Sequence, residues 1–308
     1  MFSARPPAKV NLTLEIVGRR PDGFHELRSV FLRVGGLSDR LSVSLGAASG
    51  TDTLRVDGLP GASASDNLVL RALELVRVNA GLALPALDLT LDKRIPVAAG
   101  MGGGSSDAAA ALALARAAWG VSISRPTELK LAATLGSDVP FFVTESAAAL
   151  VTGRGEEMSA LPAIVGGAGL LLVTPAMSIS TGSVFGRFDA LTGAVEPGTA
   201  TDELARELRS GIDGTRLAAL AERLRDANHL WSASASLAPS LPALRERLEQ
   251  ATDRPWLLSG SGPTLFAIYP SAHEAGDAGR LIVARSDAAD LLIHAADLTG
   301  PDPAWRYP

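Results

Sequence analysis

The stretch PVAAGMGGGSSDAAAAL, residues 96–112, constrains the fold most, because it gathers four glycines where a strand pattern gives way to a helix pattern. ALDLTLDKRIP (86–96) alternates apolar and polar residues, and SSDAAAALALARAAWG predicts a helix from about Ser105 to Trp119. Such a glycine cluster indicates backbone with positive φ or close approach to a bulky group. Because a helix N-terminus attracts anions, the loop predicts a phosphate site. The alternative is an ordinary helix start with Ser105 or Ser106 as N-cap, which needs at most one glycine.

The loop matches neither of two standard phosphate-binding motifs. A Walker A loop requires Gly-Lys-Ser/Thr at the start of the helix, and this loop has no lysine. A dinucleotide fingerprint requires a third glycine or alanine after Gly100-Met101-Gly102, but Ser105 stands at that position, far from the first strand. The sequence therefore predicts an anion site of another type.

Composition restricts the partners of the chain. The formal net charge of −5 gives no overall basic field that would attract nucleic acid or an anionic membrane. The absence of cysteine excludes disulfides, thiolate metal ligands and a cysteine nucleophile, and it fits a reducing compartment. The N-terminus does not resemble a signal peptide, and no apolar run is long enough to span a membrane. We therefore expect a cytoplasmic protein with neither nucleic-acid nor membrane partners.

The length of 308 residues suffices for two domains. Strand patterns precede a helix over 66–81, for which Asp66 is the expected N-cap and Gly81 the terminator. PTELKLAATLG (126–136) predicts another capped helix, and DVPFFVTESAAALVTGRGE predicts turns and strands. Beyond residue 165 the patterns predict the order β-α-α-α-β-β-α-β, which is typical of an α+β domain. The expected fold class is α+β, with domains at 1–163 and 164–308.

Several polar residues in apolar surroundings are candidates for chemistry, although each alone has an ordinary structural interpretation. Lys9 and Asn11 lie two apart in PAKVNLTLEI and face the same side of a strand, and from this stretch alone a solvent-facing edge strand is the better interpretation. Asp138, in LGSDVPFF, has the usual place of a turn-forming aspartate. The DGFH stretch and the glycine-serine turn in WLLSGSGPTLFAI are likewise consistent with a structural loop histidine and a hairpin turn.

Together and in this order, PAKVNLTLEIVGRRPDGFHEL, SDNLVLRAL, PVAAGMGGGSSDAAAAL, LGSDVPFF, GRGEEM and SGSGPTLFA resemble the GHMP kinases, over residues from about 7 to 268. The resemblance implies a two-domain fold, with a ribosomal-S5-like (S5 domain 2-like) N-terminal part and a ferredoxin-like C-terminal part around the active site. It also implies ATP and Mg²⁺ as cofactors. AKVNL and DGFHE are most similar to members that phosphorylate the 2-hydroxyl of a cytidine diphosphate methylerythritol in the non-mevalonate isoprenoid pathway. A mevalonate or homoserine kinase type, and a non-catalytic nucleotide sensor, are the alternatives.

The same resemblance implies roles for individual residues. Lys9 and Asp138 match the catalytic pair, in which the aspartate accepts the hydroxyl proton while the lysine holds it and offsets developing charge. The residues implied to bind ATP are Asn67, Leu68, Lys93, Pro96, Val97, Ala98, Ala99, Gly100, Met101, Gly102, Gly103, Gly104, Ser105 and Ser106. The residues implied to bind the cytidine end of the small-molecule substrate are Asn11, Phe24, His25 and Phe185. The sequence identifies no metal ligands, and we expect a monomer or a weak homodimer.

Some positions depart from the pattern of these kinases. Phe24 stands where tyrosine is common, so ring stacking is retained but the phenol hydrogen bond is lost. Ala98 and Ala99 replace a glycine-richer stretch and are expected to have ordinary backbone angles. Asp107, near the start of the helix, would repel phosphate unless it points away or meets the metal.

Overall fold

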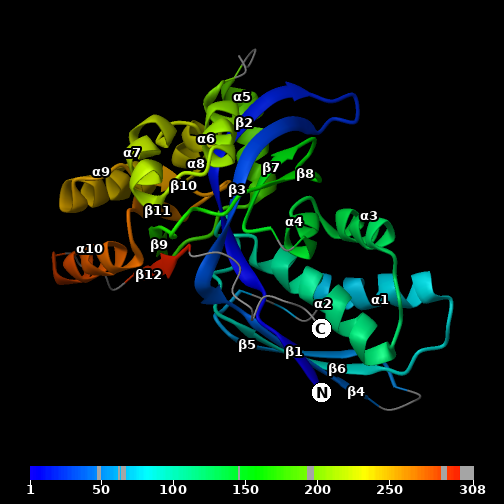
Figure 1. Ribbon diagram of the computed structural model, residues 1–308. Coiled ribbons are helices and arrows are strands. Elements are labelled where there is room, and N and C mark those ends of the chain that lie inside the picture. The colour runs from blue at the N-terminus through cyan, green and yellow to red at the C-terminus, as the bar shows by residue number, and fades with distance from the viewer. Residues whose placement is uncertain are drawn as a thin grey trace.

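The fold is described by a computed structural model for residues 1–46, 50–61, 63, 67–144, 146–192, 198–285 and 290–298. In these ranges the strands form three four-stranded sheets, with helices packed against them (Figure 1). No helix in the same ranges has both the length and the apolar character needed to cross a membrane.

The strands are β1 (Phe2–Ala4), β2 (Pro7–Arg19), β3 (His25–Ser38), β4 (Arg40–Leu45), β5 (Thr53–Gly58), β6 (Leu87–Lys93), β7 (Ala148–Thr152), β8 (Glu157–Leu161), β9 (Gly169–Pro175), β10 (Leu257–Leu258), β11 (Leu265–Tyr269) and β12 (Leu291–Asp297). The helices are α1 (Leu68–Ala80), α2 (Gly103–Trp119), α3 (Arg125–Leu135), α4 (Val139–Val143), α5 (Thr181–Leu191), α6 (Ala200–Arg209), α7 (Gly214–Leu224), α8 (Trp231–Leu237), α9 (Ser240–Thr252) and α10 (Ala272–Arg285).

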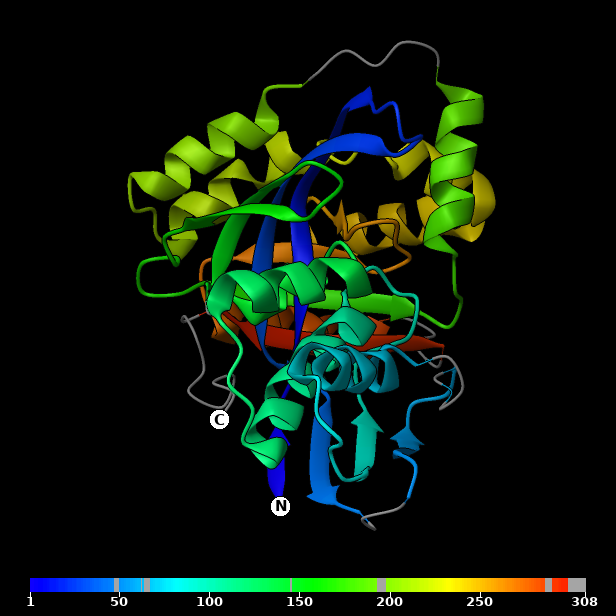
Figure 2. The same ribbon diagram turned by 90° about the vertical axis from the view of Figure 1, so that its right-hand side faces the viewer.

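The three sheets have different partners. The sheet β1-β4-β6-β5 is antiparallel except for the parallel pair β5–β6, and α1 and α2 lie together on one of its faces (Figure 2). The sheet β2-β3-β7-β8 is antiparallel and contains the two longest strands. The sheet β10-β11-β9-β12 is also antiparallel and belongs to the C-terminal half. This mixture of sheets and helices confirms the expected α+β class.

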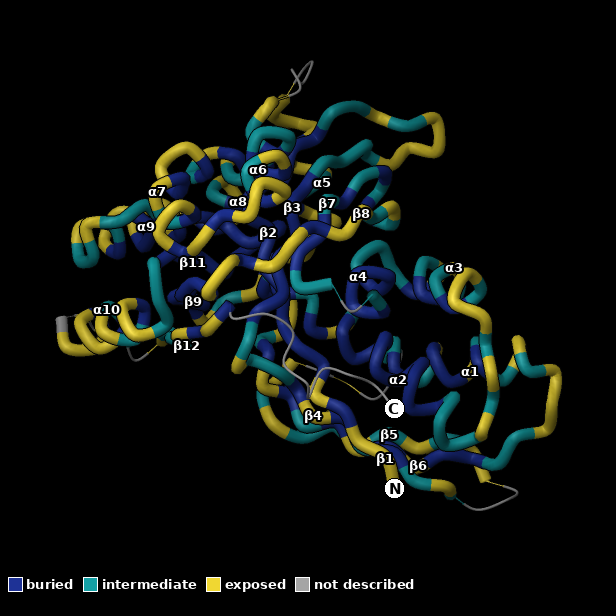
Figure 3. The backbone as a smooth tube through the Cα atoms, viewed as in Figure 1, coloured by how far each residue is buried: buried dark blue, intermediate teal, exposed yellow. Residues whose placement is uncertain are grey.

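One buried core joins the two halves of the chain. Val10 and Val30 of β2 and β3 belong to the same hydrophobic cluster as Leu170 of β9 and Phe266 of β11. These strands form the dark-blue centre of the molecule, whereas α10 and the outer loops show exposed residues (Figure 3). Burying this much aliphatic surface is the main stabilisation available to such a core. The site-bearing strands β2 and β3 are therefore held from both sides.

Helix α2 follows the glycine loop, as the sequence predicts. It begins at Gly103, two residues earlier than expected, and ends at Trp119, where Gly120 adopts φ +64. Its alanines are buried against α1 and the first sheet, because small side chains allow the close approach of neighbouring elements. The N-cap is Gly102 rather than either serine, and its φ is +67. The ordinary N-cap alternative for the loop is therefore wrong.

The start of α1 also differs from its prediction. Asn67 is the N-cap, and its Oδ1 accepts a hydrogen bond from the Val69 N–H at 3.0 Å. Asp66, the expected cap, lies outside the described residues. Asparagine and aspartate cap helices about equally well, so the sequence could not choose between these neighbours. Gly81 closes the helix with φ +62, as expected.

Two helices near the site were not predicted. The five-residue helix α4 occupies the stretch expected to form turns and strands, because five residues are too few to show a helical period. Helix α5, which carries Phe185, begins at the N-cap Ser180, whose hydroxyl accepts from the Ser183 N–H. The observed order in the C-terminal half is β-α-α-α-α-α-β-β-α-β, two helices more than predicted.

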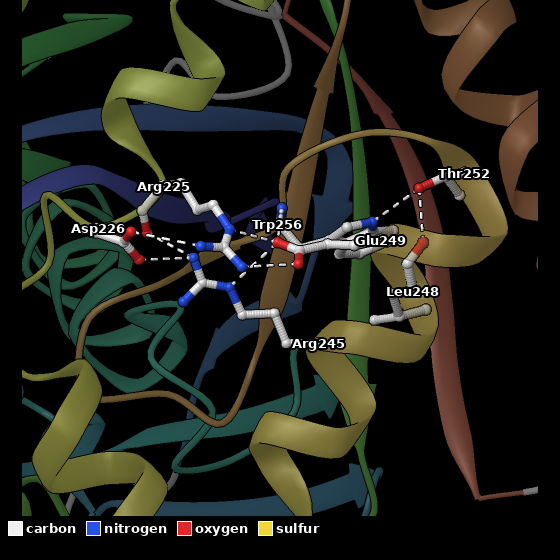
Figure 4. Close-up of polar contacts among 7 residues, drawn as sticks. All are labelled: Arg225, Asp226, Arg245, Leu248, Glu249, Thr252 and Trp256. Carbon is white, nitrogen blue, oxygen red and sulfur yellow. Dashed lines mark hydrogen bonds and ion pairs between the residues drawn. The ribbon is translucent and has the colours of Figure 1, made fainter.

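An ion-pair network supports the second glycine-serine turn, residues 259–262. Arg225 donates to both carboxylate oxygens of Glu249 at 2.6 and 2.8 Å, and Arg245 donates to Asp226 at 2.9 Å (Figure 4). Glu249 also accepts from the backbone N–H of Trp256 at 3.3 Å. Because Trp256 directly precedes β10, the network fixes the strand that leads into the turn.

Candidate active site

A cavity of about 850 Å³ opens between the glycine loop, strands β2 and β3, the turn before α4, helix α5 and the 259–262 turn. All the predicted site residues line it except Met101 and Ser106. Met101 is 2% exposed and belongs to the hydrophobic core, and Ser106 is fully buried in α2. The structure therefore brings the other predicted site residues, from Lys9 to Phe185, together around one cavity, as the resemblance implies.

The glycines of the loop serve different purposes. A Cβ on Gly100 would lie 2.0 Å from the Ser259 carbonyl oxygen, so this glycine permits the loop to contact the 259–262 turn. The Ser259 hydroxyl donates to the Gly100 carbonyl at 2.9 Å and fixes that contact. A Cβ on Gly102 would lie 3.1 Å from Lys9 Cε, whereas one on Gly104 would meet nothing within 4 Å. Among the glycines of the loop, only Gly104 combines an exposed position in the cavity with free space above its backbone.

Ala98 corrects the sequence-based expectation for this loop. Its φ is +52, in the left-handed region, so it does not have an ordinary backbone angle. A Cβ in this conformation costs about 1 kcal/mol or more, and such strain is common in binding loops. The loop therefore has, at Ala98, a backbone conformation that glycine adopts without strain and that alanine adopts only with strain. Ala99 has no positive φ, as expected.

Lys9 and Asp138 are in direct contact. Lys9 Nζ lies 3.3 Å from Asp138 Oδ2 and donates to Asn11 Oδ1 at 2.6 Å. The same ammonium lies 4.4 Å from the centroid of the Phe31 ring, which adds a cation–π contact. The Lys9 side chain is 4% exposed, whereas that of Asp138 is 30% exposed. The buried lysine is therefore fixed, and the carboxylate faces the cavity.

Asn11 lies with Lys9 rather than with the aromatic residues of the predicted cytidine end. Its Oδ1 accepts from Lys9, and its Nδ2 donates to Ser29 Oγ at 3.0 Å. Both ends of the side-chain amide are thus bonded within the protein. The sequence reasoning did not single out Ser29 or Phe31, because a serine and a phenylalanine in a strand carry no distinctive signal.

Lys93 belongs to a buried acidic cluster. Its Nζ donates to Asp107 Oδ2 at 2.7 Å and also to Asp39. Burial lowers the pKa of Lys93, but the two carboxylates outweigh burial and raise it. Burial raises the pKa of Asp107 to about 8, and Asp39 adds to this effect while Lys93 opposes it. Asp107 therefore points toward Lys93, and its raised pKa weakens the expected repulsion of phosphate.

The opposite end of the cavity is aromatic. The His25 ring stacks on Phe185, with centroids 5.1 Å apart and an interplanar angle of 27°. His25 Nε2 lies 2.7 Å from Asp189 Oδ1, so helix α5 fixes the imidazole from one side. Phe24 is 55% exposed, and its ring contacts the guanidinium of Arg154, with Cζ 5.0 Å from the centroid. Sequence reasoning singled out neither Asp189, which stands in no recognisable pattern, nor Arg154, although GRGEEM contains it.

The described residues contain no group of three or more His, Cys, Asp or Glu side chains placed to hold a metal ion. Metal ions can also be held jointly by a protein and a bound molecule. Mg²⁺ is such an ion, because it commonly binds through one or two carboxylates together with substrate phosphates. Asp138, at the cavity surface, offers one such carboxylate.

The sequence matches two parts of one kinase family. Residues 67–146 match the GHMP kinases N terminal domain, and residues 204–284 match the GHMP kinases C terminal domain. The chain belongs to the GHMP kinase family, which uses ATP. The family and fold expected from the sequence motifs are thereby confirmed.

Relatives with a more specific name cover almost the whole chain. The 4-diphosphocytidyl-2-C-methyl-D-erythritol kinase of Streptomyces avermitilis is 40% identical over 291 residues, which are 92% of each chain. A crystal structure of 4-(cytidine 5'-diphospho)-2C-methyl-D-erythritol kinase superposes with a TM-score of 0.73 at 30% identity, covering 97% of this chain and 99% of that one. Homoserine kinase from Cytophaga hutchinsonii reaches a TM-score of 0.70 at 16% identity, with 97% and 94% covered, and shares the fold alone.

Proposed function

We propose that this protein is an ATP-dependent kinase that phosphorylates the 2-hydroxyl of 4-diphosphocytidyl-2-C-methyl-D-erythritol, in the non-mevalonate route to isoprenoid precursors. The observation that carries the proposal is the 3.3 Å contact between Lys9 Nζ and Asp138 Oδ2. This pair lies in a cavity with a glycine-rich helix start and an aromatic-histidine group among its walls. The names of the relatives support the same activity.

The start of α2 is the proposed site of the ATP phosphates. The exposed Gly104 leaves room above the backbone, and the first N–H groups of the 17-residue helix are available to an anion. Asn67, Leu68 and Lys93 line the adjoining part of the cavity, where we place the adenosine. Mg²⁺ would neutralise charge on the phosphates when bound with the nucleotide. Asp138, at the cavity surface, is the carboxylate that would hold it together with the phosphates.

The catalytic pair suits proton removal from an alcohol. Asp138 exposes its carboxylate to the cavity and accepts no hydrogen bond from its own helix, so its oxygens are available to a substrate hydroxyl. Lys9 is held by Asn11 and Phe31, and its ammonium lies 3.3 Å from Asp138 Oδ2. As the proton moves to Asp138, the ammonium offsets charge that develops at the reacting oxygen. Phosphoryl transfer depends chiefly on such positioning and electrostatics.

The aromatic end suits a nucleobase. His25 and Phe185 offer a stacked aromatic surface, and the exposed Phe24 ring lines the same cavity. The cavity volume of about 850 Å³ lies in the upper part of the range for ligand sites, about 300–1,000 Å³. Mevalonate and homoserine have no base to stack, so this end distinguishes the proposed substrate from those of the other kinases with this fold. A nucleotide sensor, in turn, would not require the Lys9–Asp138 contact.

The domain division expected at residue 163 is also retained as a proposal, with the boundary in the connection between β8 and β9. Cytoplasmic location and a monomeric or weakly dimeric state likewise stay predictions.

The test is an acceptor panel. The purified protein is incubated with ATP and Mg²⁺ and with the cytidine diphosphate methylerythritol, mevalonate or homoserine, and ADP release is followed. We expect release with the first acceptor only, and loss of release in an Asp138→Asn variant that still binds ATP. ADP release with mevalonate or homoserine would assign another kinase activity. ATP binding without release on any acceptor would support the sensor alternative.

A further inference from the structure

Arg154 differs from the other cations of the cavity in having free donors. Lys9 and Lys93 each contact acidic or amide side chains, as described above. Arg154 Nε lies 3.3 Å from Glu156 Oε1, but its terminal nitrogens Nη1 and Nη2 have no hydrogen-bond partner in the described part of the chain. The side chain is 36% exposed and lines the cavity. It therefore presents a charged, planar pair of donors to whatever occupies the site.

The turn that carries Arg154 is well fixed. It connects β7 to β8 and contains Gly153 at φ +70 and Gly155 at φ +113. Glu156 Oε2 accepts from the Arg154 backbone N–H at 2.6 Å, so the same carboxylate holds the backbone and the Nε of this residue. A Cβ on Gly153 would lie 2.9 Å from that carboxylate, so only glycine leaves room for it.

Arg154 stands between the two ends of the acceptor site. Its guanidinium lies on the Phe24 ring, at the proposed base end. The next residue, Gly155, packs on the catalytic turn, because a Cβ there would lie 3.0 Å from Ser137 Cβ and 3.9 Å from Asp138 Oδ1. A single turn therefore spans the distance from the base end to the catalytic carboxylate.

The chemistry of a nucleoside diphosphate ester matches this placement. Such a molecule carries its base at one end, its reacting hydroxyl at the other and two negatively charged phosphates between them. The cavity wall also includes Asp138 and Asp189, which repel an anion. A guanidinium with free Nη atoms binds phosphate oxygens through paired, charge-assisted hydrogen bonds.

We propose that Arg154 binds the diphosphate of the acceptor substrate and thereby selects nucleoside diphosphate esters over nucleosides that lack the diphosphate. This assignment rests on the proposed function, because it takes the acceptor to be a cytidine diphosphate ester. Glu156 orients the arginine through Nε, and the Phe24 ring supports the guanidinium. Arg154 is thus a specificity-determining residue of the acceptor site.

The experiment measures the affinities of cytidine, CMP and CDP by calorimetry. Wild type, Arg154→Gln and Arg154→Lys are compared with Arg187→Gln, which removes a positive charge from α5 outside the cavity lining. In Arg154→Gln we expect the CDP-to-cytidine affinity ratio to fall about tenfold or more, because hydrogen bonds to charged groups are lost. Arg154→Lys should recover part of the ratio, and Arg187→Gln should keep it. The KM for the full acceptor should rise in Arg154→Gln more than kcat falls.

The outcomes separate this assignment from its alternatives. Equal losses of cytidine and CDP affinity in Arg154→Gln would show that the arginine only supports Phe24, and would overturn the assignment. Cytidine and CDP affinities that both stay at the wild-type values in Arg154→Gln would overturn it as well. If the wild-type protein binds neither cytidine nor CDP, a cytidine diphosphate ester is not its acceptor. The proposed function is then wrong, and so is the proposed role of Arg154.

Discussion

The Lys93 ammonium lies 2.7 Å from Asp107 Oδ2, and this contact pairs the acidic side chain nearest the start of α2 with a buried cation. Asp39 completes the cluster, since its Oδ1 accepts from the Ile95 N–H at 2.8 Å, one residue before the loop begins. Two carboxylates and one ammonium are thus buried directly beneath the proposed phosphate site. The arrangement weakens the repulsion that an anion would meet at the start of α2, because the Asp107 carboxyl is paired with Lys93 and its pKa is raised.

The first prediction concerns the pH dependence of stability. The pKa of Asp107 is raised to about 8 in the folded protein, from an ordinary value of 3.8. Between about pH 4 and pH 8 the folded state therefore holds a proton that the unfolded state has lost. This contribution to the free energy of unfolding is complete below pH 4 and is lost as the pH rises through 8. Asp107→Asn cannot titrate, so its unfolding free energy should fall less across this range.

The measurement is urea unfolding of both proteins at several pH values. The difference in unfolding free energy, wild type minus Asp107→Asn, should become steadily less favourable to wild type as the pH rises. A difference that stays constant over the range would contradict a raised pKa at Asp107.

The sequence contained much of this site but not the acidic cluster beneath it. The glycine loop is readable from its neighbouring residues, whereas Lys9 and Asp138 were assigned only by the resemblance of their motifs to a family. Asp39 joins Lys93 across 54 positions in the chain, and nothing around it distinguishes it from an ordinary turn aspartate. Its role exists only because β4 and β6 are paired in the first sheet. Long-range pairing of this kind is a property of the folded chain and has no local signal.

Ala98 and Phe185 show the same limit in two other forms. A residue's type gives only a preference for its φ, and the surrounding contacts of the loop override that preference at Ala98. Phe185 was placed at the site by resemblance, but its helix was not predicted. The periodicity of TGSVFGRFDAL is weak because two glycines interrupt it.

A second prediction tests the phosphate site with Gly104→Ala. The new methyl group would have free space in the protein, so folding is unaffected and stability should rise by up to about 1 kcal/mol. The same methyl group would stand where a phosphate approaches the backbone, so ATP affinity should fall several-fold. Gly103 is a poorer probe, because a Cβ there would lie 3.0 Å from Ile95 Cγ2 and 3.2 Å from Lys93 Nζ.

Gly186→Ala provides the matched control for that experiment. Gly186 is also helical and also has nothing within 4 Å of its missing Cβ, but it does not line the cavity. Calorimetry should show weaker ATP binding for Gly104→Ala alone, while both variants gain stability. Equal ATP affinity in the two variants would show that the ATP phosphates do not bind at the start of α2.

The strain at Ala98 gives a third prediction. Ala98→Gly should raise the free energy of unfolding by up to about 1 kcal/mol, because glycine adopts φ +52 without a steric penalty. Ala99→Gly should lower it by about 1 kcal/mol, since Ala99 has no positive φ and its methyl group is buried. Urea unfolding of both variants measures the contrast. Destabilisation by both substitutions would show that Ala98 is not strained.

A fourth prediction treats Lys9 and Asp138 as one unit. Because their charged groups are 3.3 Å apart, either alanine substitution removes the shared step. Each single variant should lose about 10²- to 10⁴-fold in single-turnover rate, and the double variant should lose little more than either. ATP affinity should be retained in all three proteins. If the fold-loss in single-turnover rate of the double variant equals the product of the two single losses, the two residues act in separate steps.

The last prediction concerns the choice of base. His25 Nε2 is taken up by Asp189 at 2.7 Å, so Nδ1 is the ring nitrogen left to meet the base. The exocyclic amine of cytosine donates at the position where uracil presents an oxygen acceptor. His25→Ala should therefore reduce the preference for cytidine over uridine diphosphate esters by about five- to tenfold in kcat/KM. Phe24→Ala should raise KM for both esters alike, because stacking does not distinguish bases. The same cytidine-to-uridine ratio in wild type and His25→Ala would show that His25 does not recognise the base.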